Sequence, residues 1–201
     1  MSARRIPNLG GSRAVILHRP HDVVDALRRQ LTAIGLSAEQ HWPDLPASVL
    51  TADFLFFDAD MGFDEQFPWK PGEAPLPSIV LIGSEAPGRI EWSLSREADA
   101  QLLKPIGSGG VYSSLLIAQQ GYEQKQMLQA KIAALRERIS QRETIVRAIS
   151  AIAGQGGDQE AGFTTLRNLA MDWQMTMEDA AKRVLVLAEK GTEWLNNRLR
   201  K

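Results

Sequence analysis

Asp58 and Lys104 are the two residues whose types and positions most clearly allow chemistry. Each ends a short apolar run, Asp58 in DFLFFDADMG and Lys104 in QLLKP. The carboxyl ends of parallel strands meet at one edge of a sheet, where ligands bind, so we expect the carboxylate and the ammonium group to lie together. The simplest interpretation is an ion pair, which His18 or Arg19 could join because both follow an earlier apolar run.

Metal and thiol chemistry are disfavoured by residue type. The chain has no cysteine, which excludes disulfides, thiolate metal ligands and a thiol nucleophile. His18, His21 and His41 fall on different predicted elements, so we predict structural or surface roles and no metal site. The sequence also has no nucleophile–base pair and no glycine loop suited to phosphate. We therefore predict a protein that is not an enzyme and needs no cofactor.

Charge is distributed unevenly along the 201 residues. The net charge is -1, but residues 1–121 hold 10 Lys and Arg against 14 Asp and Glu, and residues 122–201 hold 13 against 10. The first part is therefore at -4 and the second at +3, so contact with a polyanion is expected through the second part. The apolar run near the N-terminus is only about five residues long, too short for a signal peptide or a membrane span. We predict a cytoplasmic protein without membrane contact.

Short apolar runs alternate with a helical pattern in the first 121 residues, as in a doubly wound parallel sheet. Five strands are predicted at residues 14–17, 36–42, 54–57, 79–82 and 101–103. Val24, Leu27, Leu31 and Ile34 recur at helical spacing after the first strand, and Gly35 ends that helix. The third crossover, GFDEQFPWKPGEAPLP, contains four prolines, so we predict a loop or a short helix there.

A long proline-free segment follows Val111 and carries a heptad pattern beyond Gly121. Its apolar residues are spaced by four, three, four, seven and three, as at the a and d positions of a coiled coil, with Arg142 in the skipped position. The predicted seam consists of Leu128, Ile132, Leu135, Ile139, Val146 and Ile149. Such a stripe could also pack on the chain's own sheet, but it is too long to contact the sheet along its whole length. We therefore predict a homodimer.

Two further helices are predicted after a glycine-rich break, GQGGDQE. Asp158 in that break is suited to cap the next helix, in which Phe163 and Leu166 belong to a predicted apolar stripe. Thr176, with Asp179 three residues on, is typical of a capping box that opens the last helix. Together with the end of the long helix, these two helices make a three-helix module. The fold class is thus α/β in the first part and all-α in the second.

The first 121 residues resemble the receiver domain of response regulators. The segments DFLFFDADMG, PSIVLIG and READAQLLKP carry the likeness, which implies that Asp58 is the phospho-acceptor equivalent and Lys104 its lysine partner. A working receiver binds Mg²⁺ with two acids after its first strand, but His18 and Arg19 stand here, and Ile82 stands where a switch hydroxyl is expected. Because Mg²⁺ prefers oxygen ligands, we predict a pseudo-receiver that phosphorylation does not drive.

The segment RETIVRAISAIAGQGGDQEAGFTTLRNLAMDWQMTMEDAAKRVL resembles the ANTAR domain over its whole length. The matching residues are Arg142, Ala148, Gly162, Phe163, Leu166, Arg167, Ala170, Met171, Asp179 and Ala181. A pseudo-receiver, a coiled coil and this module, in that order, are similar to AmiR-type regulators of transcription antitermination. Trp42-Pro43 also resembles a pair at the corresponding place in those regulators.

The resemblance implies that the C-terminal module binds RNA. The candidate RNA-binding residues are Arg142, Arg147, Arg167, Lys182 and Arg183 for phosphates and base edges, and Trp173 for stacking on an unpaired base. Each cation could instead be an ordinary surface charge, and Trp173 a core residue. The family usually has Ala-Lys-Gly where this chain has Ala148-Ile149-Ser150, so one cation of the family pattern is missing.

We predict four segments: a receiver-like domain at 1–121, a coiled-coil helix at 122–147, an ANTAR RNA-binding domain at 142–190 and a tail at 191–201. The resemblance implies a dimeric regulator that binds leader mRNA hairpins and blocks the folding of a terminator. It also implies control by a ligand-sensing negative-regulator protein rather than by phosphorylation.

Two other function classes stay open. The first is a DNA-binding response regulator, which is disfavoured because the last helix would offer mostly small or apolar groups to a major groove. The residues concerned are Asp179, Ala180, Ala181, Val184 and Leu187. The second is a scaffold whose coiled coil docks another protein, which is favoured if no hairpin RNA binds.

Overall fold

The computed structural model describes residues 8–154 and 157–189. The chain divides into two compact units between Met127 and Leu128, and we describe each unit by itself. The predicted tail at 191–201 lies outside the described residues. Among the residues that are described, no helix is long and apolar enough to cross a lipid bilayer.

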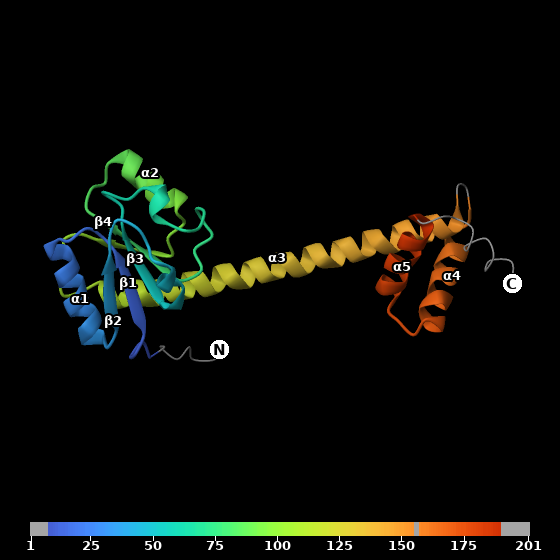
Figure 1. Cartoon of the computed structure of the whole chain (residues 1–201), viewed down its shortest axis with the longest axis horizontal. Coiled ribbons are helices and arrows are strands. Elements are labelled where there is room, and N and C mark those ends of the chain that lie inside the picture. Colours follow the sequence, from blue (N-terminus) through green and yellow to red (C-terminus); the bar gives the residue numbers. More distant parts are fainter. Residues whose placement is uncertain (1–7, 155–156, 190–201) are drawn as a thin grey trace. The chain divides into compact units, whose positions relative to one another are not determined.

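A five-stranded parallel sheet forms the centre of the first unit (Figure 1). Its strands are β1 (Arg13–Leu17), β2 (Ser37–His41), β3 (Phe54–Asp58), β4 (Ser78–Ile82) and β5 (Ala100–Leu103), in the order β2-β1-β3-β4-β5. Asp58 is in register with Leu81 of β4, and Ile82 is in register with Leu103 of β5. The residues that follow β3, β4 and β5 therefore lie at one edge of the sheet. The doubly wound parallel fold predicted from the sequence is confirmed.

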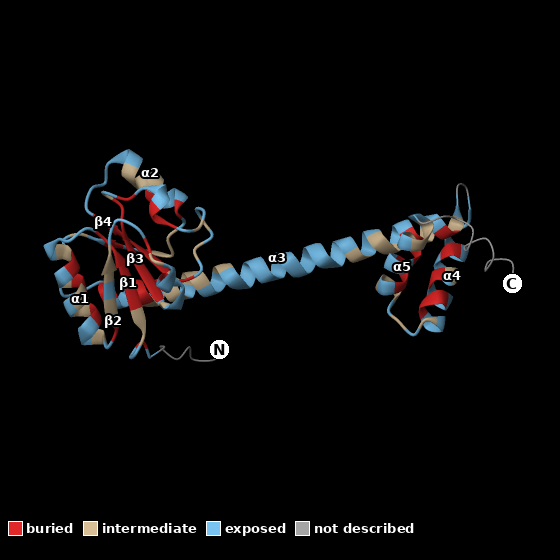
Figure 2. Ribbon diagram, in the orientation of Figure 1, coloured by how far each residue is buried: buried red, intermediate tan, exposed pale blue. Residues whose placement is uncertain are grey.

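Both faces of the sheet are covered, and β3 and β4 are buried along their whole length (Figure 2). Helix α1 (Asp22–Ile34) and the first turns of α3 (Val111–Ala153) pack on one face. Helix α2 (Pro87–Ser95), the 3-10 helix η1 (Ala47–Thr51) and the segment after the 3-10 helix η2 (Asp64–Gln66) pack on the other. Burial on both faces explains why these strands have unbroken apolar sequences.

The crossovers depart from a strict alternation of strand and α-helix. The helix after β1 ends at Gly35, as predicted, with φ 96°. At its start, the His21 ring accepts a hydrogen bond from the Val23 N–H group. Between β2 and β3, however, the sequence-based alternation is wrong, because η1 stands there instead of an α-helix. Pro43 and Pro46 break up that segment, and proline disrupts a helix interior. Between β3 and β4 lies the predicted short helix, η2.

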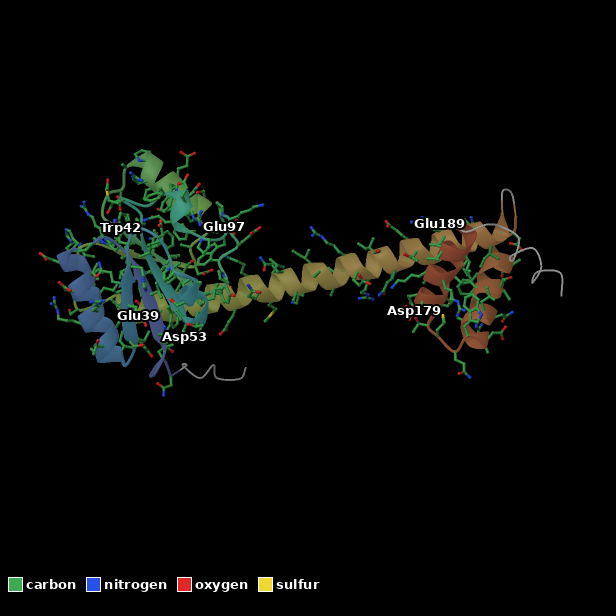
Figure 3. The ribbon with its side chains drawn as sticks, in the orientation of Figure 1. Glu39, Trp42, Asp53, Glu97, Asp179 and Glu189 are labelled. Atoms are coloured by element: carbon green, nitrogen blue, oxygen red, sulfur yellow. The ribbon has the colours of Figure 1, made fainter. Side chains whose placement is uncertain are left out.

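The second unit contains the end of α3 together with α4 (Gln159–Asp172) and α5 (Met177–Glu189) (Figure 1). Its core consists of Ala148, Ile152, Leu166, Leu169, Ala170, Ala180, Ala181 and Val184. Asp158 caps α4 by accepting from the Glu160 N–H group at 2.9 Å. Asp179, labelled in Figure 3, lies in the first turn of α5. Thr176 Oγ1 accepts from the Asp179 N–H group at 3.2 Å and donates to the Asp179 carboxylate at 3.0 Å. Both predicted N-terminal caps are thus present.

Candidate functional site

Asp58 and Lys104 form the ion pair that their positions predict. Lys104 Nζ lies 2.7 Å from Asp58 Oδ1, and Asp58 is only 3% exposed. His18, which follows β1, joins them: its Nε2 lies 3.5 Å from Asp58 Oδ2, and its Nδ1 lies 2.7 Å from the Arg19 carbonyl oxygen. Because a carbonyl oxygen only accepts, Nδ1 carries a hydrogen. The role of Asp58 as a phospho-acceptor equivalent stays a prediction.

Asp60 also belongs to this cluster, although its role there was not predicted from the sequence. Its carboxylate contacts Lys104 Nζ and accepts from the backbone N–H groups of Gly83 at 3.1 Å and Ser84 at 2.8 Å. Desolvation acts to raise the pKa of Asp60, but Lys104 and the two backbone donors outweigh it and hold that pKa below its ordinary value. The available signal was a second acid two residues after a strand end, with a glycine directly after the next strand.

A hollow of about 340 Å³ opens beside these carboxylates. Its lining includes His18, Arg19, His21, Lys104 and Pro105 in addition to Asp58 and Asp60. Within residues 8–154 and 157–189, no group of three or more His, Asp or Glu side chains is arranged to hold a metal ion. The lining carries basic or imidazole groups at His18, Arg19, His21 and Lys104 against two carboxylates. This composition suits an anion better than a cation.

The predicted seam lies on α3, where most of its apolar side chains are exposed (Figure 2). Leu128, Ile132, Leu135, Ile139 and Val146 are 40% to 59% exposed. Ile149 is half-buried against the core of the three-helix module. In contrast, Val111 and Ala118, three and two heptads before Ile132, are buried on the sheet. One stripe of α3 is thus covered by the sheet at its start and uncovered further along.

The residues that carry the ANTAR resemblance separate into a buried and an exposed group. Ala148, Leu166, Ala170 and Ala181 are buried in the module core. Gly162 also has a packing role, because a Cβ atom there would lie 2.9 Å from the Ile149 carbonyl oxygen. Phe163, Arg167 and Met171 are exposed, Phe163 by 44% and Met171 by 67%. Their spacing of four places them on one face of α4, and we call these three residues the α4 stripe.

The predicted RNA-binding residues are all at the surface except Trp173. Arg142, Arg147, Arg167, Lys182 and Arg183 are exposed. Trp173 is half-buried against the module core, and the Arg183 guanidinium lies 4.4 Å from the centre of its ring. Of the two interpretations of Trp173, packing within the module is therefore the better supported. Contact of any of these side chains with RNA stays a prediction.

Three of the five residues that the last helix was predicted to offer to a DNA groove are buried, so that prediction was wrong. Ala180, Ala181 and Val184 are fully buried, so they cannot face a groove. The exposed side of α5 presents Lys182 and Arg183. Asp179 and Glu189 on the same helix are also exposed, so the surface of α5 carries charges of both signs, and its residue types alone do not separate RNA from DNA as a ligand.

Comparison with known proteins gives matches for both units. The family model described as AmiR, N-terminal, matches residues 12–119, and the model of the ANTAR domain matches residues 133–185. The aliphatic amidase regulator of Pseudomonas aeruginosa is 27% identical over 152 residues, which cover 73% of this chain and 76% of that protein. Among solved structures, the chain is similar to a receiver domain of ShkA in complex with c-di-GMP, with 26% identity, a TM-score of 0.41, and coverage of 57% of this chain and 94% of that one. It is also similar to full-length FixJ from B. japonicum, with 13% identity, a TM-score of 0.43, and coverage of 90% and 99%.

Proposed function

Because the chain belongs to the AmiR N-terminal family and carries an ANTAR domain, we propose that it is a transcription antitermination regulator that binds hairpins of a leader transcript as a dimer. The likeness to the aliphatic amidase regulator supports this assignment. Control by a ligand-sensing partner protein, rather than by phosphorylation, is supported by His18, which lies against Asp58 at a position where a working receiver has a Mg²⁺-binding acid.

The α4 stripe is the observation that carries the RNA-binding part of the proposal. Phe163 and Met171 are apolar and exposed, and Arg167 lies one helical turn from each. Unpaired bases in RNA loops stack on aromatic side chains, with about 1–3 kcal/mol per base, and arginine donates to phosphates and base edges. A hollow of about 470 Å³, lined in part by Arg167, Met171 and Met175, adjoins the stripe and is suited to hold an unstacked base.

The exposed seam supports the dimeric part of the proposal. A narrow apolar stripe on a single helix is the pattern by which coiled coils associate, and five of its six positions are 40% to 59% exposed in one chain. Two copies joined along α3 would carry two ANTAR modules. Such a dimer can hold two hairpins at once, so that the second hairpin binds at a high effective concentration.

The test uses RNA that the full chain selects in cells. RNA crosslinked to the chain is sequenced, and the recovered segment is compared in gel shifts with duplex DNA of the same sequence. We expect the chain to prefer the RNA, with an affinity that falls about a thousandfold between roughly 50 and 200 mM salt if about six phosphates are contacted. Equal binding to the duplex would favour the DNA-binding alternative, and no binding to either at low salt would favour the scaffold.

Single substitutions locate the interface on the module. Arg167→Ala is expected to weaken RNA binding by about 1–3 kcal/mol, the usual cost of losing an arginine that contacts a base edge. Phe163→Ala is expected to cost a similar amount through lost stacking. Arg29→Ala, at an exposed position of α1, removes the same charge from the other unit and serves as the matched control. Wild-type affinity in both module variants would place the interface elsewhere.

A further inference from the structure

Three donors from two neighbouring strand ends surround the Asp60 carboxylate. The backbone N–H groups of Gly83 and Ser84 follow β4, and Lys104 follows β5. Asp60 itself follows β3, the strand next to β4 in the sheet. The edge of the sheet therefore builds a site with two backbone donors and one ammonium group, which we call the oxyanion cradle (Gly83 N–H, Ser84 N–H and Lys104 Nζ).

Gly83 shows how closely the backbone and the carboxylate approach each other. A Cβ atom at position 83 would lie 2.5 Å from Asp60 Oδ2 and 2.9 Å from Lys104 Cε. Any residue with a side chain would displace one of these groups, so the glycine is needed for space at this point. The cradle is thus shaped around an anion that sits against the backbone.

The same donors are the ones that an oxyanion next to Asp58 would need. Lys104 Nζ is shared between Asp58 Oδ1, at 2.7 Å, and Asp60, and Asp58 Oδ1 also accepts from the Asp60 N–H group at 3.1 Å. With the Asp60 carboxylate in place, both backbone donors of the cradle are taken, and the Lys104 ammonium group already contacts two carboxylates. The lowered pKa of Asp60 indicates that its charged form is the one that the cradle stabilises.

We propose that Gly83, Ser84 and Lys104 form an oxyanion-binding site whose resident ligand is the chain's own Asp60 carboxylate, and that removal of this carboxylate opens the site to a free tetrahedral oxyanion such as sulfate or phosphate. The first unit is thereby held in an anion-bound state without a phosphoryl group. The hollow beside the carboxylates, lined by His18, Arg19 and Lys104, gives such an anion a route from solvent.

The experiment follows sulfate binding to the full chain by NMR at constant ionic strength. The amide signals of Gly83 and Ser84 are recorded for the wild type, for Asp60→Ala and for Glu85→Ala, which removes an equal charge from an exposed position of the same loop. We expect saturable shifts of both amides in Asp60→Ala only. The affinity for sulfate should be about tenfold higher or more than in the other two chains, which corresponds to about 1.4 kcal/mol.

Two further variants keep the proposal falsifiable. Asp60→Asn retains the shape of the side chain without its charge, so it gives the same readout if Asp60→Ala does not fold. The double variant Asp60→Ala and Gly83→Ala fills the cradle with a methyl group and is expected to lose the sulfate-dependent shifts. The proposal is overturned if neither Asp60 variant shows saturable amide shifts, or if the wild type binds sulfate as tightly as they do.

Discussion

Replacement of Ile139 by aspartate is expected to weaken dimerisation strongly. Ile139 is 56% exposed in the single chain, and full burial of an isoleucine side chain contributes about 1.5–3 kcal/mol. Covering the exposed part therefore contributes about 0.8–1.7 kcal/mol per copy, or about 1.7–3.4 kcal/mol for a symmetric pair. Aspartate removes this contribution and brings two like charges into the seam. We expect the dissociation constant of the dimer to rise about a hundredfold, since about 1.4 kcal/mol is a factor of ten.

Sedimentation equilibrium of the full chain over a range of concentrations measures this change. Ala134→Asp adds the same charge at an exposed position of α3 outside the seam, and it is expected to leave the dimer intact. Circular dichroism checks that both variants keep their helix content. The reasoning is refuted if the wild type is already monomeric at working concentrations, or if Ile139→Asp associates as tightly as Ala134→Asp.

Three other outcomes follow from contacts within each unit. The pKa of Asp60 is lowered in the folded chain, so the contribution of its charged form to stability is complete above the ordinary aspartate pKa and is lost as pH falls through the lowered value. In urea titrations, the wild type should therefore lose its stability advantage over Asp60→Asn below about pH 4. Gly162→Ala places a Cβ atom against the Ile149 carbonyl, and it should destabilise the second unit by about 1–3 kcal/mol in urea unfolding. Arg183→Ala removes the cation–π contact with Trp173, and a loss of about 0.5–1 kcal/mol in thermal unfolding is expected.

The sheet was predictable because burial on both faces requires nearly unbroken runs of apolar residues, which can be recognised in the sequence. The apolar runs of β3 and β4 are fully buried, and the predicted strands agree with the observed ones to within one or two residues. The expectation of an α-helix between β2 and β3 was wrong, because the prolines of that crossover disrupt a helix interior. In that crossover the prolines determined the local structure, whereas in the strands the pattern of apolar residues determined it.

The candidate site was predictable only where side chains meet side chains. The pairing of Asp58 with Lys104 follows from two strand ends and two opposite charges. The position of Asp60 does not, because two of its three partners, Gly83 and Ser84, contribute backbone N–H groups, which every residue but proline carries. Phe163 and Leu166 were assigned to one apolar stripe, but Phe163 is 44% exposed whereas Leu166 is buried. Two apolar residues three positions apart cannot show which of them the neighbouring helices cover.

One heptad position of α3 occurs in two different environments. Val111 and Ala118 are held in the core of the first unit, and they occupy the same heptad positions as Ile132 and Ile139 further along the one helix. At Val111 and Ala118 the side chain must fit the sheet of its own chain, whereas at Ile132 and Ile139 it is exposed. We therefore expect the first two positions to tolerate only side chains of fitting size, and the later two to tolerate any apolar side chain that keeps the helix.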